Sequence, residues 1–252
     1  MDLKELEQID SGGLQHWYYR SKFLAVKHLI RNIRAEKILD VGAGSGIFSK
    51  MLLMDNFSRS AYCLDTGYKY DRAEFINGKK ILYINNIDLI TQNLVLFMDV
   101  MEHVHDDTAF LREYVEKMPD GCYVLISVPA FMFIWSQHDT FLNHQRRYSR
   151  TQLEKVICES GLDLIDTRFF FGLIFPLAAC LRILSRFRKK EEAKSDLVPC
   201  PPWLNRSLIH IHDLESKTLF RINKWFGLTL FCLAKKPKQS PNPIDQETCP
   251  LT

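Results

Sequence analysis

The sequence lacks several features that mark whole classes of protein. None of its seven cysteines belongs to a C-x-x-C pair and their number is odd, so we interpret them as reduced core thiols and predict a cytoplasmic protein. The first ten residues alternate in charge without an apolar stretch, so no secretory signal is expected. A net charge of +3 falls short of the basic stripe of nucleic-acid-binding proteins, so nucleic acid is not expected as a partner.

A long apolar run is also missing. A bilayer span needs roughly 20 apolar residues, whereas residues 169–181 offer 13 uncharged ones, interrupted by Pro176 and followed by basic residues up to Lys190. Two interpretations stay open: an amphipathic helix peripheral to an anionic membrane surface, or a cover over the substrate cleft or a dimer face. The polar, proline-containing residues 236–252 are expected to be a disordered tail.

What is present indicates one α/β domain. With 46% hydrophobic residues in 252, the chain can bury a real core. Apolar runs alternate with helical patterns after residue 37, which predicts a doubly wound sheet. Capping residues at Asp106 and Ser149 mark two of the helix starts. The predicted strands cover residues 37–41, 61–64, 81–84, 94–98, 123–128, 162–170 and 227–235.

The end of the first strand carries the most informative motif. It reads Asp40-Val41-Gly42-Ala43-Gly44-Ser45-Gly46, and the glycines let the backbone turn sharply and approach a ligand closely. Dinucleotide-binding turns space their glycines as G-x-G-x-x-G, whereas this turn reads G-x-G-x-G after an acid. Asp40 is suited to bind the ammonium group of a cationic ligand.

Two further acids follow later strands. Asp65 ends the second strand, 19 positions after Gly46, where a carboxylate can accept hydrogen bonds from both ribose hydroxyls. Asp88 follows the third strand and is our candidate for an adenine contact, ahead of Asn86. Asp65 could instead serve as a turn or helix-cap acid.

The D-x-G-x-G-x-G pattern resembles motif I of the class I S-adenosylmethionine-dependent methyltransferases. Residues 16–20, H-W-Y-Y-R, resemble the H-W-W/Y-x-x-R segment of bacterial methyltransferases that modify lipids, polyprenyls or glycans. The resemblance implies a seven-stranded Rossmann-like sheet with an antiparallel last strand over residues 1–235, with an N-terminal helical lid at 1–36 and a helical insertion at 171–226. The cofactor contacts it implies are Asp40, Gly42, Ala43, Gly44, Gly46, Asp65, Asp88, Asp99, Tyr19 and Arg20.

A second group of residues follows the fourth strand. Asp99, Glu102 and His103, with His144 downstream, resemble the E-x-x-E-H and distal histidine of ubiquinone-pathway and small-RNA O-methyltransferases, in which a divalent metal orients the acceptor. Asp99 is one methylene shorter than the family's glutamate, which favours a metal-free site. There His103 or His144 would act as a general base, or Glu102 and His103 would merely connect loops.

The loop after the fifth strand is expected to cover the acceptor. His138, Arg146 and Arg147 are candidate substrate contacts, although the arginines could instead form salt bridges. The predicted reaction is O-methylation of a lipid-linked, quinone-like or glycan acceptor, ahead of an RNA 2′-hydroxyl. Two alternatives remain: a catalytically silent, membrane-associated cofactor-binding module, and an NAD-dependent oxidoreductase.

Overall fold

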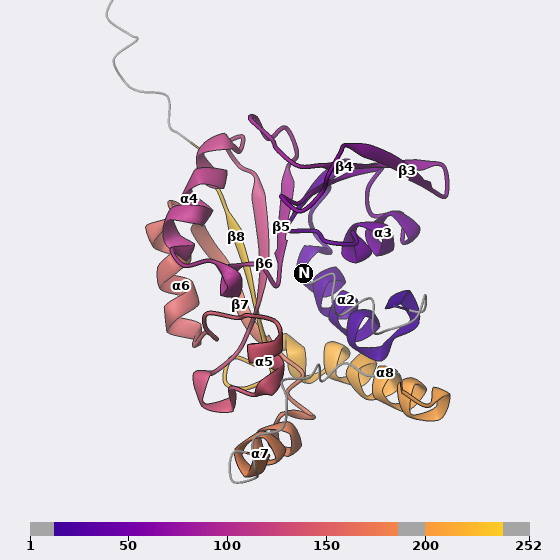
Figure 1. Ribbon diagram of the computed structural model, residues 1–252, viewed down its shortest axis with the longest axis vertical. Coiled ribbons are helices and arrows are strands. Elements are labelled where there is room, and N and C mark those ends of the chain that lie inside the picture. The colour runs from indigo at the N-terminus through magenta and orange to yellow at the C-terminus, as the bar shows by residue number, and fades with distance from the viewer. Residues whose placement is uncertain (1–12, 186–199, 239–252) are drawn as a thin grey trace, which may run out of the picture.

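The computed structural model describes residues 13–185 and 200–238. They form one eight-stranded sheet in the order β3-β4-β2-β1-β5-β6-β8-β7, with helices on both faces (Figure 1). The α/β class predicted from the sequence is therefore confirmed.

The centre of the sheet is parallel and buried. Strand β5 (Leu94–Met98) is buried at every position and lies between β1 (Lys37–Val41) and β6 (Tyr123–Pro129). Such continuous apolar runs are typical of parallel strands covered on both faces. On the other side of β1, β2 (Ser60–Leu64) and β4 (Lys79–Ile84) continue the parallel arrangement.

The last strand is antiparallel, as predicted. Strand β8 (Thr229–Lys235) inserts between β6 and β7 (Asp163–Phe170) and runs antiparallel to both. Because β7 and β8 are paired neighbours, the long segment between them leaves and re-enters the sheet at adjacent positions.

The prediction of seven strands is wrong by one. Strand β3 (Arg72–Ile76) pairs with β4 as an antiparallel edge strand. Its residues are mostly exposed or half-buried, so the apolar pattern that revealed the other strands is absent. The usable signal was Asn77-Gly78, whose positive φ angles of 50° and 75° are those of a tight hairpin turn.

Two layers of helices cover the sheet. One face carries α2 (Trp17–Ile30), α3 (Ile47–Met54) and α8 (Pro202–Lys217), and the other carries α4 (Asp107–Lys117) and α6 (Arg150–Glu159) (Figure 1). The predicted caps are confirmed: Asp106 accepts a hydrogen bond from the Ala109 amide at 2.9 Å, and Ser149 forms a capping box with Gln152. Helix α8 packs against α2.

Four further helices gather at the carboxyl ends of the parallel strands. They are η2 (Met101–His103), η3 (Met132–Ile134), α5 (Gln137–Phe141) and α7 (Phe175–Ser185). Two further turns, η1 (Gly13–Gln15) and η4 (Leu219–Arg221), flank α2 and α8. Among the described residues, no helix combines the length and apolarity needed to cross a bilayer.

Parts of the predicted lid, insertion and tail lie outside the described residues: 1–12, 186–199 and 239–252. The six described cysteines are all free. Cys63, Cys122 and Cys232 are buried, but Cys158 and Cys180 are exposed, so the prediction of core thiols is wrong for these two.

Candidate active site

The glycine turn after β1 has the backbone conformation that its sequence predicts. Gly42, Gly44 and Gly46 have φ angles of +64°, +56° and +70°, a region that disfavours side chains. A Cβ at Gly42 would lie 2.6 Å from a methyl of Val100, and one at Gly46 would lie 2.9 Å from the Cys63 sulfur. Conformation and close packing therefore both require glycine at these two positions.

Asp65 connects this turn to the end of β2. One carboxylate oxygen accepts a hydrogen bond from the Gly44 amide and the other from the Gly67 amide, both at 2.9 Å. The Tyr68 hydroxyl donates to the Gly44 carbonyl from the same loop. Each oxygen of Asp65 keeps further acceptor capacity, so the arrangement is compatible with the predicted ribose contact, which stays a prediction.

Asp40 lies beneath the turn and is 2% exposed. It accepts a hydrogen bond from the Ser49 hydroxyl of α3 at 3.0 Å, and burial raises its pKa to about 6. Asp88 is exposed, with one oxygen 3.4 Å from the Asn86 amide nitrogen. The predicted ammonium and adenine contacts of these two acids stay predictions.

A cavity of about 550 Å³ opens at the carboxyl ends of the central strands. Asp99, Glu102, His103 and His144 line one part of it, and His138 and Arg147 also reach its wall. Trp17 and Tyr18 of α2 line it, whereas Tyr19 is fully buried against Phe48 and Arg20 is exposed. The cofactor contacts predicted for Tyr19 and Arg20 stay predictions.

Another part of the cavity lining is mostly apolar. It is formed by Phe171, Ile174, Ala178, Leu181 and Leu228, with Arg182 and Ser185 beside them. Ile174 and Ala178 are four residues apart, and Leu181 is three further on, so they share one helical face. The cavity lining therefore combines charged and imidazole side chains with apolar side chains.

A buried lysine that the sequence analysis missed holds Asp99. Lys22 of α2 is fully buried and forms an ion pair and hydrogen bond with the Asp99 carboxylate. The Ser127 hydroxyl donates to the other Asp99 oxygen at 3.1 Å. Burial opposes ionisation of Asp99, but the charge of Lys22 outweighs it and keeps the Asp99 pKa below its usual value.

The sequence carried a signal for the burial of Lys22, although not for the identity of its partner. Lys22 lies on the same face of α2 as the buried residues Tyr19, Phe23 and Val26, and a buried lysine requires an acidic partner. The pairing also bears on the predicted metal site, because the Asp99 carboxylate is ion-paired with Lys22; its role as a metal ligand stays a prediction. The group that could hold an ion contains only Glu102, His103 and His144 within the described residues.

Ligand atoms of these three residues lie within 4.8 Å of one another. The rings of His103 and His144 meet edge to face with centroids 4.8 Å apart. Glu102 is 1% exposed, and its Oε2 accepts no hydrogen bond from the described residues. Burial, with the negative charge of Asp99, raises the Glu102 pKa well above its usual value.

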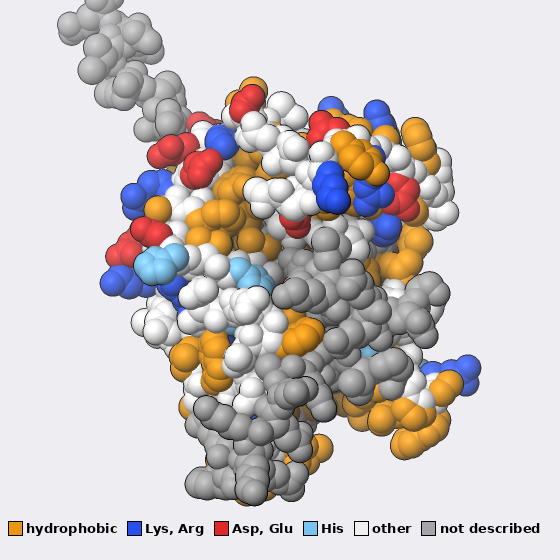
Figure 2. All heavy atoms as spheres, viewed as in Figure 1, with side chains coloured by type: hydrophobic (Ala, Val, Ile, Leu, Met, Phe, Trp, Pro, Cys, Tyr) orange, Lys and Arg blue, Asp and Glu red, His pale blue; other side chains and the backbone are white. Residues whose placement is uncertain are grey.

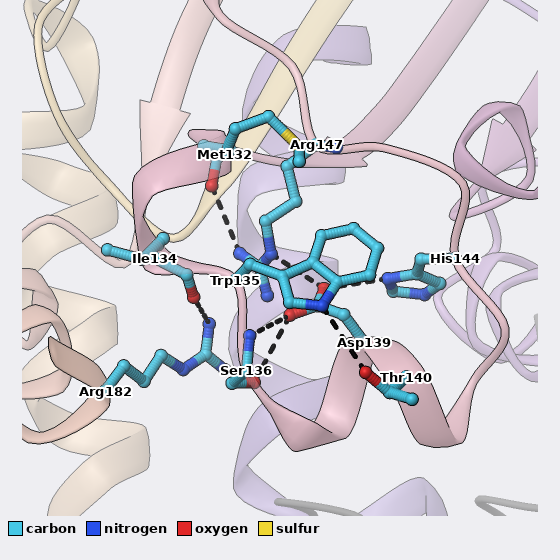
Figure 3. Close-up of polar contacts among 10 residues, drawn as sticks. Met132, Ile134, Trp135, Ser136, Asp139, Thr140, His144, Arg147 and Arg182 are labelled. Carbon is cyan, nitrogen blue, oxygen red and sulfur yellow. Dashed lines mark hydrogen bonds and ion pairs between the residues drawn. The ribbon is translucent and has the colours of Figure 1, made fainter. Parts of the chain in front are cut away.

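His144 is oriented by Asp139, a second residue that the sequence analysis missed (Figure 3). The His144 Nδ1 lies 2.9 Å from Asp139 Oδ1, and the Arg147 Nε donates to the same oxygen at 2.7 Å. Burial opposes ionisation of Asp139, but these contacts hold its pKa below the usual range. An ionised carboxylate only accepts hydrogen bonds, so Nδ1 of His144 carries a proton, and in the neutral ring the lone pair lies on Nε2.

The backbone around Asp139 fixes its position. The amide and hydroxyl of Ser136 donate to Asp139 Oδ2 at 2.8 and 3.2 Å, in a capping box that starts α5. Arg147 also donates to the Ala130 carbonyl at 3.1 Å. The spacing of Ser136 and Asp139 is the signal that could have identified this carboxylate from the sequence.

The two candidate substrate arginines are engaged within the protein. Arg146 donates to Asp107 at 3.0 Å and to the His105 carbonyl at 2.5 Å, and it does not line the cavity. Arg147 holds Asp139. The salt-bridge alternative therefore describes both arginines, and their predicted substrate contacts stay predictions.

Comparison with known proteins decides the family. A model of the family described as a methyltransferase domain matches residues 14–167, which is more than half of the chain. The chain belongs to this methyltransferase family. The glycine turn and Asp65 fall within the matched residues, so the NAD-dependent alternative does not hold.

A distant sequence relative is the ubiquinone biosynthesis O-methyltransferase of Rickettsia prowazekii, which is 21% identical; the match covers 69% of this chain and 82% of the relative. Among solved structures, the chain is similar to the putative methyltransferase in complex with the Haloferax volcanii Trm112 activator. That match has a TM-score of 0.54 and 14% identity, and covers 93% of this chain and 97% of the other.

A second solved structure is phosphoethanolamine N-methyltransferase 2 of Haemonchus contortus in complex with S-adenosyl-L-methionine. It matches with a TM-score of 0.50 and 14% identity over 85% of this chain and 52% of that one. These distant structures show a shared fold. The family match itself identifies the chain as a class I, S-adenosyl-L-methionine-dependent methyltransferase, and the solved structures agree with it in fold.

Proposed function

We propose that this methyltransferase transfers a methyl group to a hydroxyl oxygen of a lipid-linked, quinone-like or similarly amphiphilic small molecule. The supporting observation is the mixed lining of the cavity, in which the buried carboxyl group of Glu102 and two imidazoles are combined with apolar side chains. A hydroxyl head would lie against Glu102, His103 and His144, and an apolar tail would lie along α7.

His144 is the proposed general base. The acceptor oxygen attacks the sulfonium methyl carbon, the carbon–sulfur bond breaks, and its electron pair stays on the sulfur of the neutral thioether. The hydroxyl proton passes to Nε2 of His144, and Asp139 stabilises the resulting imidazolium through Nδ1. Alignment of oxygen, methyl and sulfur supplies much of the rate enhancement, up to roughly 7–11 kcal/mol in favourable systems.

The same residues also fit a divalent ion. The unpaired Oε2 of buried Glu102, together with one nitrogen from each of His103 and His144, forms a mixed carboxylate and imidazole set that suits Mn²⁺, Fe²⁺ or Zn²⁺. Such an ion would act as a Lewis acid that acidifies the acceptor hydroxyl. His144 cannot ligate an ion and accept a proton through Nε2 at the same time.

Chelation separates these two versions of the site. If His144 is the base, dialysis against EDTA leaves turnover unchanged. Loss of turnover after EDTA, with recovery on addition of Mn²⁺ or Mg²⁺, would show that a metal ion activates the acceptor and that His144 is not the base.

The acceptor class is tested by mass spectrometry. The purified protein is incubated with cell extract and either ordinary or methyl-labelled cofactor. Lipid, RNA and aqueous fractions are searched for a product that gains about 14 Da with the ordinary cofactor, because a methyl group replaces a hydrogen, and more with the labelled cofactor. We expect a labelled product in the lipid fraction. A product confined to RNA or to polar metabolites would overturn the amphiphilic acceptor.

His144→Gln tests the placement of the base. We expect turnover to fall by about 10²- to 10⁴-fold while the affinity for S-adenosylhomocysteine, measured by calorimetry, stays near wild type. A large loss of cofactor affinity would contradict the placement of His144 on the acceptor side.

We also propose that the enzyme works peripherally on an anionic membrane. The supporting observation is that both α7, through Leu177 and Leu184, and α8, through Trp203 and Leu214, carry apolar side chains that are each at least half exposed. Figure 2 shows hydrophobic side chains on the protruding part where Figure 1 places α8, with basic side chains at its tip. Exposed patches of this kind mark interaction surfaces.

A further inference from the structure

A second hollow lies away from the methyl-transfer cavity. It measures about 290 Å³ and is lined by His28, Arg31, Arg168 and Arg221. These residues come from the end of α2, from edge strand β7 and from η4. His28 follows Trp17, which lines the large cavity, by 11 positions along α2, a separation of about 16 Å at 1.5 Å per residue.

Positive charge in this hollow is not balanced by nearby acids. Arg31 and Arg221 are exposed, and neither has an acidic partner among the described residues. Arg168 is paired with Asp166 at 2.6 Å, and Lys224 lies 3.8 Å from the other oxygen of Asp166. Two of the three arginines in the hollow therefore have no carboxylate partner among the described residues, and the third shares Asp166 with Lys224.

The hollow is also held in shape by hydrogen bonds to the backbone. Arg168 donates to the Phe220 carbonyl at 3.2 Å and to the Arg221 carbonyl, which ties β7 to η4. Arg31 donates to the His28 carbonyl at 2.6 Å. The guanidinium groups are thus partly ordered before any ligand arrives, which reduces the entropy lost on binding.

The pKa of His28 depends on the electrostatic potential in the hollow. Its ring packs edge to face on Phe220 with centroids 5.5 Å apart. Burial and the charges of Arg31, Arg168 and Arg221 lower the His28 pKa to about 4, with Asp166 acting weakly in the opposite direction. An anion in the hollow would offset the arginine charges and raise this pKa.

We propose that this hollow is a binding site for a phosphate group, separate from the cofactor and acceptor sites. Guanidinium groups match phosphate oxygens in charge and in hydrogen-bond geometry. The phosphate comes either from a free phosphate compound or from the headgroup of an anionic phospholipid, since Ile222 and Trp225 beside Arg221 are 63% and 67% exposed. The two sources are separated by the experiment.

The first arm uses inorganic phosphate with the full-length protein. Binding is followed by calorimetry and by NMR titration of His28, at constant ionic strength set with chloride. We expect saturable binding and a rise in the His28 pKa. The double variant Arg31→Gln/Arg221→Gln should weaken binding at least tenfold, whereas Arg59→Gln, which removes an exposed arginine before β2, should not.

The second arm uses vesicles of phosphatidylcholine with and without phosphatidylglycerol. Vesicle binding that needs phosphatidylglycerol and is lost in the double variant, without binding of free phosphate, identifies the lipid headgroup as the source. Binding of free phosphate that is lost in the double variant identifies a free phosphate compound. If neither ligand binds, or if the double variant binds both as wild type does, the proposal is overturned, whatever the outcome of the methyl-transfer assays.

Discussion

Two carboxylates that each have a cationic partner define the chemistry of the cavity. Asp99 is neutralised by Lys22, while Asp139 is held between His144 and Arg147. The first pair connects helix α2 to the end of β5, and the second orients a base. Their different partners lead to different expectations for mutation.

Asp139→Asn should lower turnover, and because it leaves the buried Arg147 without its carboxylate it should also reduce stability. Without the carboxylate, Nδ1 of His144 is no longer required to carry the proton, so Nε2 loses its fixed role as acceptor. We expect kcat to fall by roughly 10- to 100-fold, the range for loss of a group that orients a functional histidine. Cofactor affinity, measured with S-adenosylhomocysteine, should not change.

Ser136→Ala is the matched control for this experiment. It removes the hydrogen bond of the Ser136 hydroxyl to the far oxygen of Asp139 and the cap contact of that hydroxyl with the Asp139 amide, but it leaves the contact with His144 in place. Near wild-type turnover is expected. Equal losses in both variants would indicate that Asp139 acts through the structure of α5 rather than through His144.

Lys22→Met should destabilise the protein because it leaves Asp99 buried without its cation. Removing one partner of a buried ion pair costs about 3–5 kcal/mol. Lys22→Met/Asp99→Asn should recover part of that loss in urea denaturation. The interpretation fails if the double variant is no more stable than the single one.

The raised pKa of Asp40 predicts a pH dependence of stability. The folded protein keeps a proton on Asp40 up to a pH of about 6, whereas the unfolded chain releases it near 3.8. Asp40 therefore favours the folded state fully below pH 3.8, and this contribution is lost as the pH rises to about 6, by up to about 3 kcal/mol. Urea denaturation between pH 4 and 7 should show a flatter dependence for Asp40→Asn than for wild type.

At the scale of single elements, the sequence predicted the buried strands and the helix starts, because both depend on the pattern of neighbouring residues. Buried strands such as β5 are continuous apolar runs, and the helix starts at Asp106 and Ser149 carry their own caps, so their positions follow from neighbouring residues. Strand β3 was missed because its side chains are largely exposed and it depends on pairing with β4. Local pattern does not specify such an edge strand.

The site was predicted less completely, for a similar reason. Glu102, His103 and His144 were found through a motif, and the structure brings them together. Lys22 was missed because its role depends on a partner distant in the sequence. Asp139 was missed because its role depends on the tautomer of His144. Lys22 and Asp99 are 77 positions apart, and no local spacing rule connects them.

The glycine turn offers a test at the element scale. Gly42→Ala should weaken cofactor binding because the new methyl meets Val100 and the φ angle is positive. Gly78→Ala is the control: its φ of +75° gives similar backbone strain, but no atom lies within 4 Å of the new methyl. Gly78→Ala should reduce stability by about 1 kcal/mol and leave cofactor affinity unchanged.

A second substitution at Val100 separates the steric clash at position 42 from the backbone strain there. If crowding against Val100 causes the loss, Gly42→Ala/Val100→Ala should recover part of the cofactor affinity measured by calorimetry. No recovery would assign the loss to backbone strain alone.

At the scale of the whole molecule, the exposed apolar surface of α7 and α8 predicts membrane binding. Leu177→Ser/Leu184→Ser should reduce co-sedimentation with anionic vesicles, because both leucines are exposed and neither lines the cavity. Leu89→Ser is the control, since Leu89 is 69% exposed in a loop before β5. Binding that is unaffected by the double variant would place the contact elsewhere.

The pairing of Phe170 with Thr229 has a consequence for how such enzymes diversify. This pair joins the two ends of residues 171–228, so the insertion is topologically a long hairpin loop between the antiparallel strands β7 and β8. The closure entropy of a flexible loop rises only slowly with its length, so lengthening or exchanging this loop costs the sheet little. New acceptor specificities can therefore arise by exchange of residues 171–228, while β1, β2 and β5, which carry the candidate cofactor residues, stay unchanged.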